Sequence, residues 1–207
     1  NLSESFETNA SVDVMYADAI TGARQIQMLG LSGIYTQMMT ENFPSLRGLT
    51  TPYGLSYVPG PWMHSIQISK GTSSVINGYE SITGQINVEY KKPDDIEKFA
   101  FNAYGSEDGK IDLNSNIALK ISDSWSSNLL LHAEQLTLEH DRNHDGFMDE
   151  ATGKQYNILN RYKYKGQGPF IIQYGVKLVG DQKKGGQLKP TSETVYAAFA
   201  TGFWKGL

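Results

Sequence analysis

The residues best suited to bind an ion lie in one short segment, residues 141–150, which reads DRNHDGFMDE. Oxygen-bearing side chains recur there at alternate positions, and Gly146 follows the third of them. Calcium-binding loops use this spacing because oxygens at positions one, three and five surround one cation. Glycine then permits the tight turn, and position seven supplies a backbone carbonyl. The segment therefore predicts a Ca2+ site, whose expected ligands are Asp141, Asn143, Asp145, Phe147 and Asp149.

This loop departs from the best-known calcium motif at its end. Thr152 stands at position twelve, where that motif has a glutamate that binds through both oxygens. The flanking segments also alternate like strands, so the loop is no helix–loop–helix site. We expect acids of a neighbouring loop, such as Glu107 and Asp108, to complete the site. The alternative is a solvent-exposed hairpin loop that binds no ion, and the sequence leaves both interpretations open.

A second group of residues combines thioether sulfur with imidazole nitrogen, which suits copper ions. Methionine is also a common residue of packed cores, and core packing is the favoured interpretation here. His132 and His140 are interpreted as strand or loop residues that face a lumen or solvent, not as metal ligands. The copper candidates are Met28, Met38, Met39, Met63 and His64.

Catalysis and nucleic-acid binding find little support in the sequence. The chain has 207 residues, no cysteine and a net charge of −4, whereas nucleic-acid-binding domains usually carry a basic patch. Acidic residues are scattered without a partner base or a recognisable nucleophile, and the spacing of a phosphate-binding loop is absent around Lys70-Gly71. We therefore expect a protein that is not an enzyme, that uses no organic cofactor and that binds no nucleic acid.

From Phe99 onward the chain alternates between apolar and polar residues. The apolar residues of 111–121 share one face of a strand and the polar ones share the other, and residues 170–178 repeat the arrangement. Strands of this length and pattern are typical of membrane β-barrels, and equally of a soluble sheet with one wet face. No run of about 18 apolar residues is present, which excludes a membrane-spanning helix.

The connections between these strands favour a membrane barrel. Short turns are predicted at residues 122–125 and 166–169, and longer connections at residues 139–155 and after Asp181. Short turns at one end and long loops at the other are the asymmetry of outer-membrane barrels. About six strands fit between Phe99 and Trp204.

Residues 66–92, IQISKGTSSVINGYESITGQINVEYKK, are the most specific segment of the chain. Apolar residues alternate at both ends of the segment, which predicts two strands. Between them Gly71, Gly78 and Gly84 lie where the backbone must turn sharply or approach another segment closely. The paired lysines Lys91 and Lys92 then precede Pro93.

This segment resembles the end of the plug domain of TonB-dependent outer-membrane receptors, whose pattern runs I-x-x-I-E-V-x-K-G-P-x-S-x-x-Y-G-x-x-A-x-G-G-x-I-N-I-x-T-K. The resemblance implies an α+β plug domain followed by antiparallel transmembrane β-barrel strands. Residues 1–92 would form a plug that is incomplete at its N-terminus, and residues 93–207 the first strands of the barrel. Barrels that hold a plug have about 22 strands, so we expect this chain to be part of a longer protein.

The resemblance also implies a function and a set of contact residues. Members of the family import scarce ligands across the bacterial outer membrane, and loops of the plug hold the ligand. Aromatic side chains suit large rigid chelates, and the residues expected to contact the ligand are Tyr35, Tyr53, Tyr57 and Trp62. For each of them, packing inside the plug is the alternative. Arg24 and Arg47 are expected to contact the inner barrel wall, Arg47 because it begins an Arg-Gly dipeptide found in the family.

The family further implies partners and a choice of ligands. TonB, with ExbB and ExbD, would supply energy from the inner membrane, and outer-membrane lipid would surround the barrel. Cobalamin or another metal chelate of the siderophore type is the first choice of ligand. Cobalamin transporters of this class have an acidic calcium-binding loop with an Asn-Asp-Gly-Phe run like residues 143–147. The alternatives are a Bacteroidetes receptor that imports glycans or peptides beneath a surface lipoprotein lid, or, for a complete chain, a soluble all-β binding module.

Overall fold

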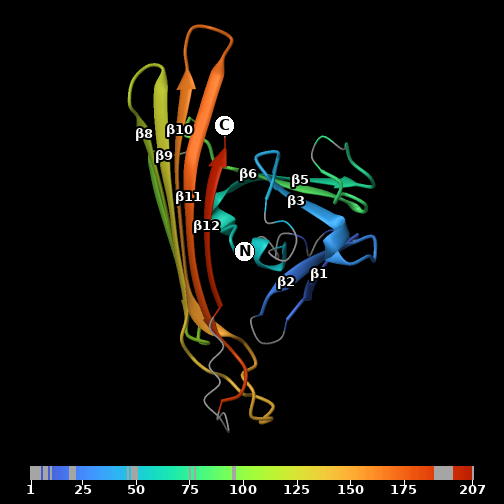
Figure 1. Cartoon of the computed structure of the whole chain (residues 1–207). Coiled ribbons are helices and arrows are strands. Elements are labelled where there is room, and N and C mark those ends of the chain that lie inside the picture. Colours follow the sequence, from blue (N-terminus) through green and yellow to red (C-terminus); the bar gives the residue numbers. More distant parts are fainter. Residues whose placement is uncertain are drawn as a thin grey trace. The chain divides into compact units, whose positions relative to one another are not determined.

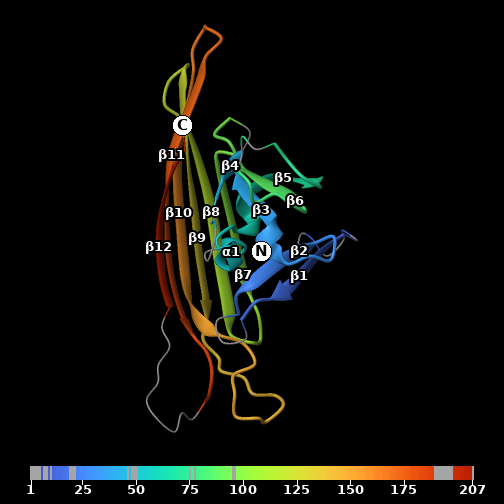
Figure 2. The same cartoon turned by 45° about the vertical axis from the view of Figure 1, so that its right-hand side comes forward.

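A computed structural model of the chain divides into two compact units, coloured along the sequence in Figure 1 and turned by 45° in Figure 2. The first unit comprises residues up to Asp18 and from Gly22 to Lys91, and the second runs from Lys92 onward together with residues 19–21. Backbone alone is described for Tyr53 and residues 198–206. The described residues are 6, 9, 11–18, 22–45, 47, 51–74, 76, 78–94, 97–188 and 198–206.

The first unit contains two small sheets. Strands β1 (Val12–Tyr16) and β2 (Arg24–Met28) form an antiparallel pair. The second sheet has the order β4-β3-β6-β5, and its strands are β3 (Thr36–Thr40), β4 (Phe43–Pro44), β5 (Met63–Lys70) and β6 (Gly84–Tyr90). In it, β6 pairs in parallel with β3 and antiparallel with β5. The two strands predicted within residues 66–92 are therefore confirmed as neighbours.

Helical structure in the described part of the chain is confined to single turns. They are η2 (Gly33–Tyr35), α1 (Thr51–Gly54) and η4 (Gly60–Trp62). No helix among the described residues has the length and apolar character needed to cross a membrane. The predicted strands of this part of the chain are therefore observed, whereas the α component of the predicted α+β class is limited to these single turns among the described residues.

The core of the first unit forms around β6, because this central strand has a partner on each side. Ile86 and Val88 are fully buried, and Trp62 packs edge-on against Tyr90 with ring centroids 6.0 Å apart. Met28 is also fully buried, and Met38 and Met39 are buried in β3. These methionines therefore have the core environment that the sequence favoured over a copper site.

The start of β6 requires a residue without a side chain. A Cβ atom on Gly84 would lie 2.3 Å from the sulfur of Met28 and 2.3 Å from the backbone oxygen of Ser69. Such a distance is far inside van der Waals contact, so the strand approaches its neighbours more closely than any other residue permits. The close backbone approach predicted at this glycine is confirmed.

The second unit contains one antiparallel sheet of six strands in sequence order, from β7 at one edge to β12 at the other. Each strand pairs with the next along the chain over most of its length. The six strands predicted after Phe99 are thereby confirmed. They are β7 (Phe99–Gly105), β8 (Lys110–Lys120), β9 (Trp125–Leu136), β10 (Thr152–Lys165), β11 (Ile171–Lys184) and β12 (Ala198–Gly206).

The connections of this sheet differ between its two ends. Residues 121–124 and 166–170 form short turns at one end. At the other end residues 106–109 turn tightly, while residues 137–151 form a longer connection, as Figure 1 shows. The connection from β11 to β12 is also longer in sequence. The predicted placement of the two long connections opposite the two short turns is confirmed.

The two sides of this sheet have different chemistry because strand side chains alternate and neighbouring strands keep a common register. We call them the apolar face and the polar face. Exposed residues of the apolar face include Ile111, Leu113, Leu119, Tyr156, Ile158, Ile172, Tyr174, Val176 and Leu178. The polar face carries Asp112, Asn114, Asn116, Asn128, His132, Glu134, Gln155, Asn157, Arg161, Lys177 and Asp181.

Two glycines of the β10–β11 pair provide a test of this packing. A Cβ on Gly153 would lie 2.2 Å from the backbone oxygen of Gln182, whereas a Cβ on Gly180 would meet no atom within 4 Å. We expect Gly153→Ala to destabilise the sheet by about 1–3 kcal/mol, as overpacking does, and Gly180→Ala to change stability by less than about 0.5 kcal/mol. Denaturant unfolding of the two variants of the full-length protein measures the difference. Equal stability would contradict this register.

Candidate functional site

The aromatic residues predicted to contact a ligand lie in different environments. Tyr35 ends η2 with 38% of its surface exposed, and its backbone oxygen accepts hydrogen bonds from the backbone N–H groups of Ile82 and Thr83. Tyr57 and Trp62 are buried in the first unit. Their environment favours the packing role that the sequence left as the alternative, and ligand contact by Tyr35 remains a prediction. The side chain of Tyr53 lies outside the described part of the structure.

The two arginines predicted to contact a barrel wall have partners inside the first unit. Arg24 donates a hydrogen bond of 3.1 Å to the Tyr16 hydroxyl and lies over the Tyr16 ring. Arg47 forms an ion pair with Glu80, with Nε 2.6 Å from Oε1, and its guanidinium lies 5.9 Å from the centre of the Tyr79 ring. These contacts hold both cations in place, and contact with a wall remains a prediction.

The Asp-rich segment between β9 and β10 forms a loop closed by its own side chains. The Asp141 carboxylate accepts hydrogen bonds of 3.0 Å from the backbone N–H groups of Asp145 and Gly146, through different oxygens. The Asp145 carboxylate accepts a hydrogen bond of 2.8 Å from the Phe147 N–H, and the Asp149 carboxylate accepts one of 2.9 Å from the Arg142 N–H. The side chains that were predicted to bind Ca2+ therefore organise the loop backbone in this structure.

The same loop is anchored to its surroundings on both sides. Met148 donates a backbone hydrogen bond to Gly186, and Leu188 donates one to Gly146, so the loop pairs with the segment that follows β11. Asp108, which was expected to help bind the ion, instead pairs with the guanidinium of Arg142. A Ca2+ ion would have to compete with this arginine for Asp108, so the five residues of the loop itself remain the predicted ligands.

One cluster was not predicted as a site. Asp112 of β8 and His132 and Glu134 of β9 lie together on the polar face, and one ligand atom from each fits within 4.8 Å of the others. It is the one such group of three or more histidine and acidic residues that could hold a metal among the described residues. The sequence shows Asp-x-Asn and His-x-Glu on two strands, but only the register places them side by side.

Aromatic residues gather at one end of the second unit. On the apolar face, Trp125 and three tyrosines lie beside the short turns, with the ring centroids of Tyr162 and Tyr174 5.1 Å apart in a stacked pair and those of Trp125 and Tyr164 also 5.1 Å apart.

An ion pair joins the start of the second unit to β10. Asp94 accepts a hydrogen bond from the Lys163 ammonium group. Burial alone would raise the pKa of Asp94, but this hydrogen bond and the charges of Lys163 and Lys165 outweigh it and hold the pKa below its usual value.

Comparison with solved structures identifies the fold. The siderophore receptor PirA from Acinetobacter baumannii superposes on 89% of this chain and 29% of its own chain, with a TM-score of 0.68 and 16% sequence identity. A mutant of the ferric enterobactin receptor PfeA from Pseudomonas aeruginosa superposes on 88% of this chain and 30% of its own chain, with a TM-score of 0.67 and 12% sequence identity. The chain has the fold of TonB-dependent receptors.

A third solved structure has the same fold, whereas comparisons of the sequence itself find no match. The FrpB iron transporter from Neisseria meningitidis superposes on 89% of this chain with a TM-score of 0.66 and 11% identity. The chain spans about 30% of the length of these structures. No protein-family model and no curated protein sequence matches it. The similar structures are described as receptors and a transporter.

Calcium binding by residues 141–149 can be tested directly. We expect millimolar Ca2+ to bind the full-length protein with measurable heat and to slow proteolysis of the loop, because a cation would offset three carboxylates in one turn. Asp141→Ala should abolish both effects, whereas Asp123→Ala, at the opposite end of the sheet, should leave them unchanged. Absence of binding heat, with equal protease sensitivity in Ca2+ and in EGTA, would make the loop a structural hairpin.

Proposed function

We propose that this chain forms the plug and the first wall strands of a TonB-dependent receptor that imports a metal chelate across the bacterial outer membrane. The first unit corresponds to the plug and the six-stranded sheet to the wall. The observation that carries the proposal is the match of both units together, over 88–89% of the chain, to siderophore and iron receptors. The plug-like segment from Ile66 to Lys92 supports it from the sequence.

The two faces of the sheet supply the physical support for a wall. In a membrane barrel the apolar face contacts lipid, and polar residues line the interior. Aromatic residues gather where hydrocarbon meets water, because their rings have an apolar body and a polar edge. The apolar face here ends in the cluster of Trp125, Tyr162, Tyr164 and Tyr174 beside the short turns. We infer that this cluster marks the periplasmic boundary of the bilayer.

A siderophore-type iron chelate is the ligand that the similar structures favour. PirA is described as a siderophore receptor, and PfeA as a ferric enterobactin receptor that has been crystallised with enterobactin. Cobalamin is the second candidate, because the Asp-rich loop lies in the hairpin where cobalamin transporters of this family carry a calcium loop. Nothing in the described residues favours import of a glycan or peptide, or a lipoprotein lid.

Import against a gradient requires energy that ligand binding alone does not supply. We propose that TonB, with ExbB and ExbD, delivers that energy to the plug. The soluble-module alternative predicts no dependence on TonB and no contact with lipid. Dependence on TonB and contact with lipid therefore distinguish the proposed receptor from a soluble binding module.

The ligand and the energy source can be tested by growth. A strain that lacks the full-length protein should regain growth on a ferric catecholate siderophore as sole iron source when the gene is restored. Deletion of tonB should abolish that growth. Rescue by cobalamin alone would replace the siderophore assignment and keep the transporter class. Uptake that persists without TonB would overturn the proposed energy coupling.

Contact between the apolar face and lipid can be tested with one substitution. Leu178, in the middle of β11, is 42% exposed, and Leu138, in the loop after β9, is 47% exposed. In a bilayer Leu178→Arg should cost about 2–4 kcal/mol of folding free energy, whereas an exposed residue in water tolerates the change to within about 0.5 kcal/mol. Leu138→Arg is the matched control. Unfolding titrations of the full-length protein in lipid vesicles measure both, and equal effects would favour a soluble sheet.

A further inference from the structure

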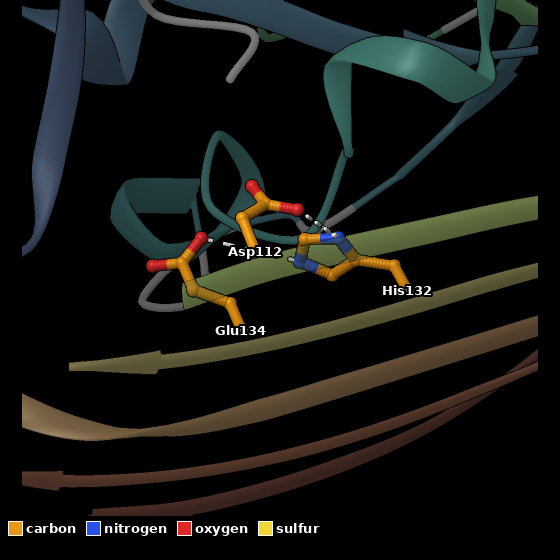
Figure 3. A group of neighbouring side chains, drawn as sticks. All are labelled: Asp112, His132 and Glu134. Atoms are coloured by element: carbon orange, nitrogen blue, oxygen red, sulfur yellow. Dashed lines mark ion pairs between the residues drawn. The ribbon is translucent and has the colours of Figure 1, made fainter. Parts of the chain in front are cut away.

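We propose that Asp112, His132 and Glu134 bind a divalent first-row transition cation such as Zn2+ on the polar face of the sheet. Figure 3 shows the three side chains next to one another above two neighbouring strands, with Asp112 beside one nitrogen of the His132 ring and Glu134 beside the other. One ligand atom from each residue lies within 4.8 Å of the others. One imidazole and two carboxylates make a mixed nitrogen and oxygen donor set, which suits these cations. Neither the receptor fold nor the proposed import function requires such a site.

The register of β8 and β9 builds the cluster. Asp112 lies directly opposite Glu134, and Asn114 lies directly opposite His132. Residues two apart on one strand point to the same face, so all four side chains stand next to one another on the polar face. Both strands are paired on each side, β8 with β7 and β9, and β9 with β8 and β10. The backbone that carries the ligands is therefore rigid.

The imidazole of His132 is held in the orientation that metal binding requires. Its Nδ1 lies 2.9 Å from the side-chain oxygen of Asn114, which can accept a hydrogen bond from a proton on Nδ1. In the neutral tautomer with that proton, the lone pair of Nε2 is free to bind a cation, and Nε2 lies 4.0 Å from Oε2 of Glu134. A ligating histidine usually donates its other ring N–H to an oxygen in this way, because that bond fixes both tautomer and orientation. The side chain of His132 is 3% exposed.

The two carboxylates of the cluster lie directly opposite one another on neighbouring strands. Like charges directly opposite one another on neighbouring strands destabilise a sheet. Lys110 offsets part of this repulsion, since its ammonium group lies 3.4 Å from Oε1 of Glu134. The other oxygen of Glu134, Oε2, faces Nε2 of His132. The Asp112 carboxylate accepts a hydrogen bond of 2.6 Å from the Asn114 amide and lies 3.4 Å from Nδ1 of His132. A divalent cation at this point would offset the charge of both acids.

A buried amide that has no hydrogen-bond partner in the described part of the chain lies on the strand next to the cluster. Asn157 of β10 lies directly opposite His132 and is fully buried. Neither its side-chain oxygen nor its side-chain nitrogen has a hydrogen-bond partner among the described residues. Buried amides are seldom left unpaired, and an unseen water or ion is a common reason. Three protein ligands leave an open coordination position, and a metal-bound water there would give Asn157 a partner.

The spacing of the donor atoms is wider than in a filled site. Tetrahedral bonds of about 2.0–2.2 Å place neighbouring donor atoms roughly 3.3–3.6 Å apart. Nε2 of His132 and Oε2 of Glu134 are 4.0 Å apart, and the three ligand atoms lie within 4.8 Å of one another, so the carboxylates have to move toward the ion when it binds. The alternative occupant is a second proton on His132, which would make the ring a bridge between the two acids.

Measuring Zn2+ binding by the full-length protein distinguishes a bound cation from a second proton on His132. The protein is stripped with a chelator, purified in detergent and titrated with ZnCl2 in competition with a fluorescent zinc chelator at pH 7.5. We expect His132→Gln, Glu134→Gln and Asp112→Asn each to weaken binding at one site at least tenfold, because each removes a ligand. His140→Gln is the matched control, since it changes a histidine of the loop after β9 and should leave Zn2+ affinity unchanged.

Two results would overturn the proposal. One is a wild-type protein that binds no more Zn2+ than the His132→Gln variant, which would leave the second proton as the occupant. The other is displacement of the bound Zn2+ by millimolar Ca2+, which prefers sites made of oxygen alone. The conservative Asp112→Asn and Glu134→Gln variants keep the size of each side chain, so the comparison survives if His132→Gln fails to fold. Because the readout is binding, a negative result leaves the import function untouched, and the growth assay tests that function separately.

Discussion

A side chain on a strand can point to only two sides of its sheet, and the register between neighbouring strands decides which residues share a side. In the second unit this constraint operates over six strands whose backbone groups pair continuously. A slip of one residue in β9 would move His132 to the apolar face and Leu131 to the polar face. The apolar face, the polar face and the cluster of Asp112, His132 and Glu134 therefore depend on the same hydrogen bonds between strands.

Much of this fold could be predicted from local patterns. Alternation over residues 111–121 and 170–178 predicted the strands and the faces of the second unit, because a period of two is visible within a single strand. The strands within residues 66–92 were predicted for the same reason, and the close approach at Gly84 followed from the absence of a side chain there. These features depend on residues near one another in sequence, so the sequence displays them directly.

The sites were harder to predict because they depend on residues distant in sequence. Predicting that Asp112 lies opposite Glu134 requires the register across a hairpin. Predicting the ion pair of Asp108 with Arg142 requires the relative positions of two loops. Tyr57 and Trp62 were ranked by residue type as ligand contacts, yet aromatic residues serve a core equally well, and burial is a property of the whole unit. The hydrogen bonds of Asp141 show a further ambiguity, since the same oxygens that would bind an ion also cap backbone N–H groups.

The strands β7 and β12 lie at the two ends of the sheet order, and each has a partner on one side only among the described strands. An edge strand with free N–H and C=O groups is a template for any other extended chain, including a second copy of itself. Burying such groups in hydrocarbon without partners costs several kcal/mol each, so these six strands cannot enter a bilayer until both edges are satisfied. If the sheet is part of a membrane wall, as proposed, its assembly is therefore tied to the strands that pair with β7 and β12.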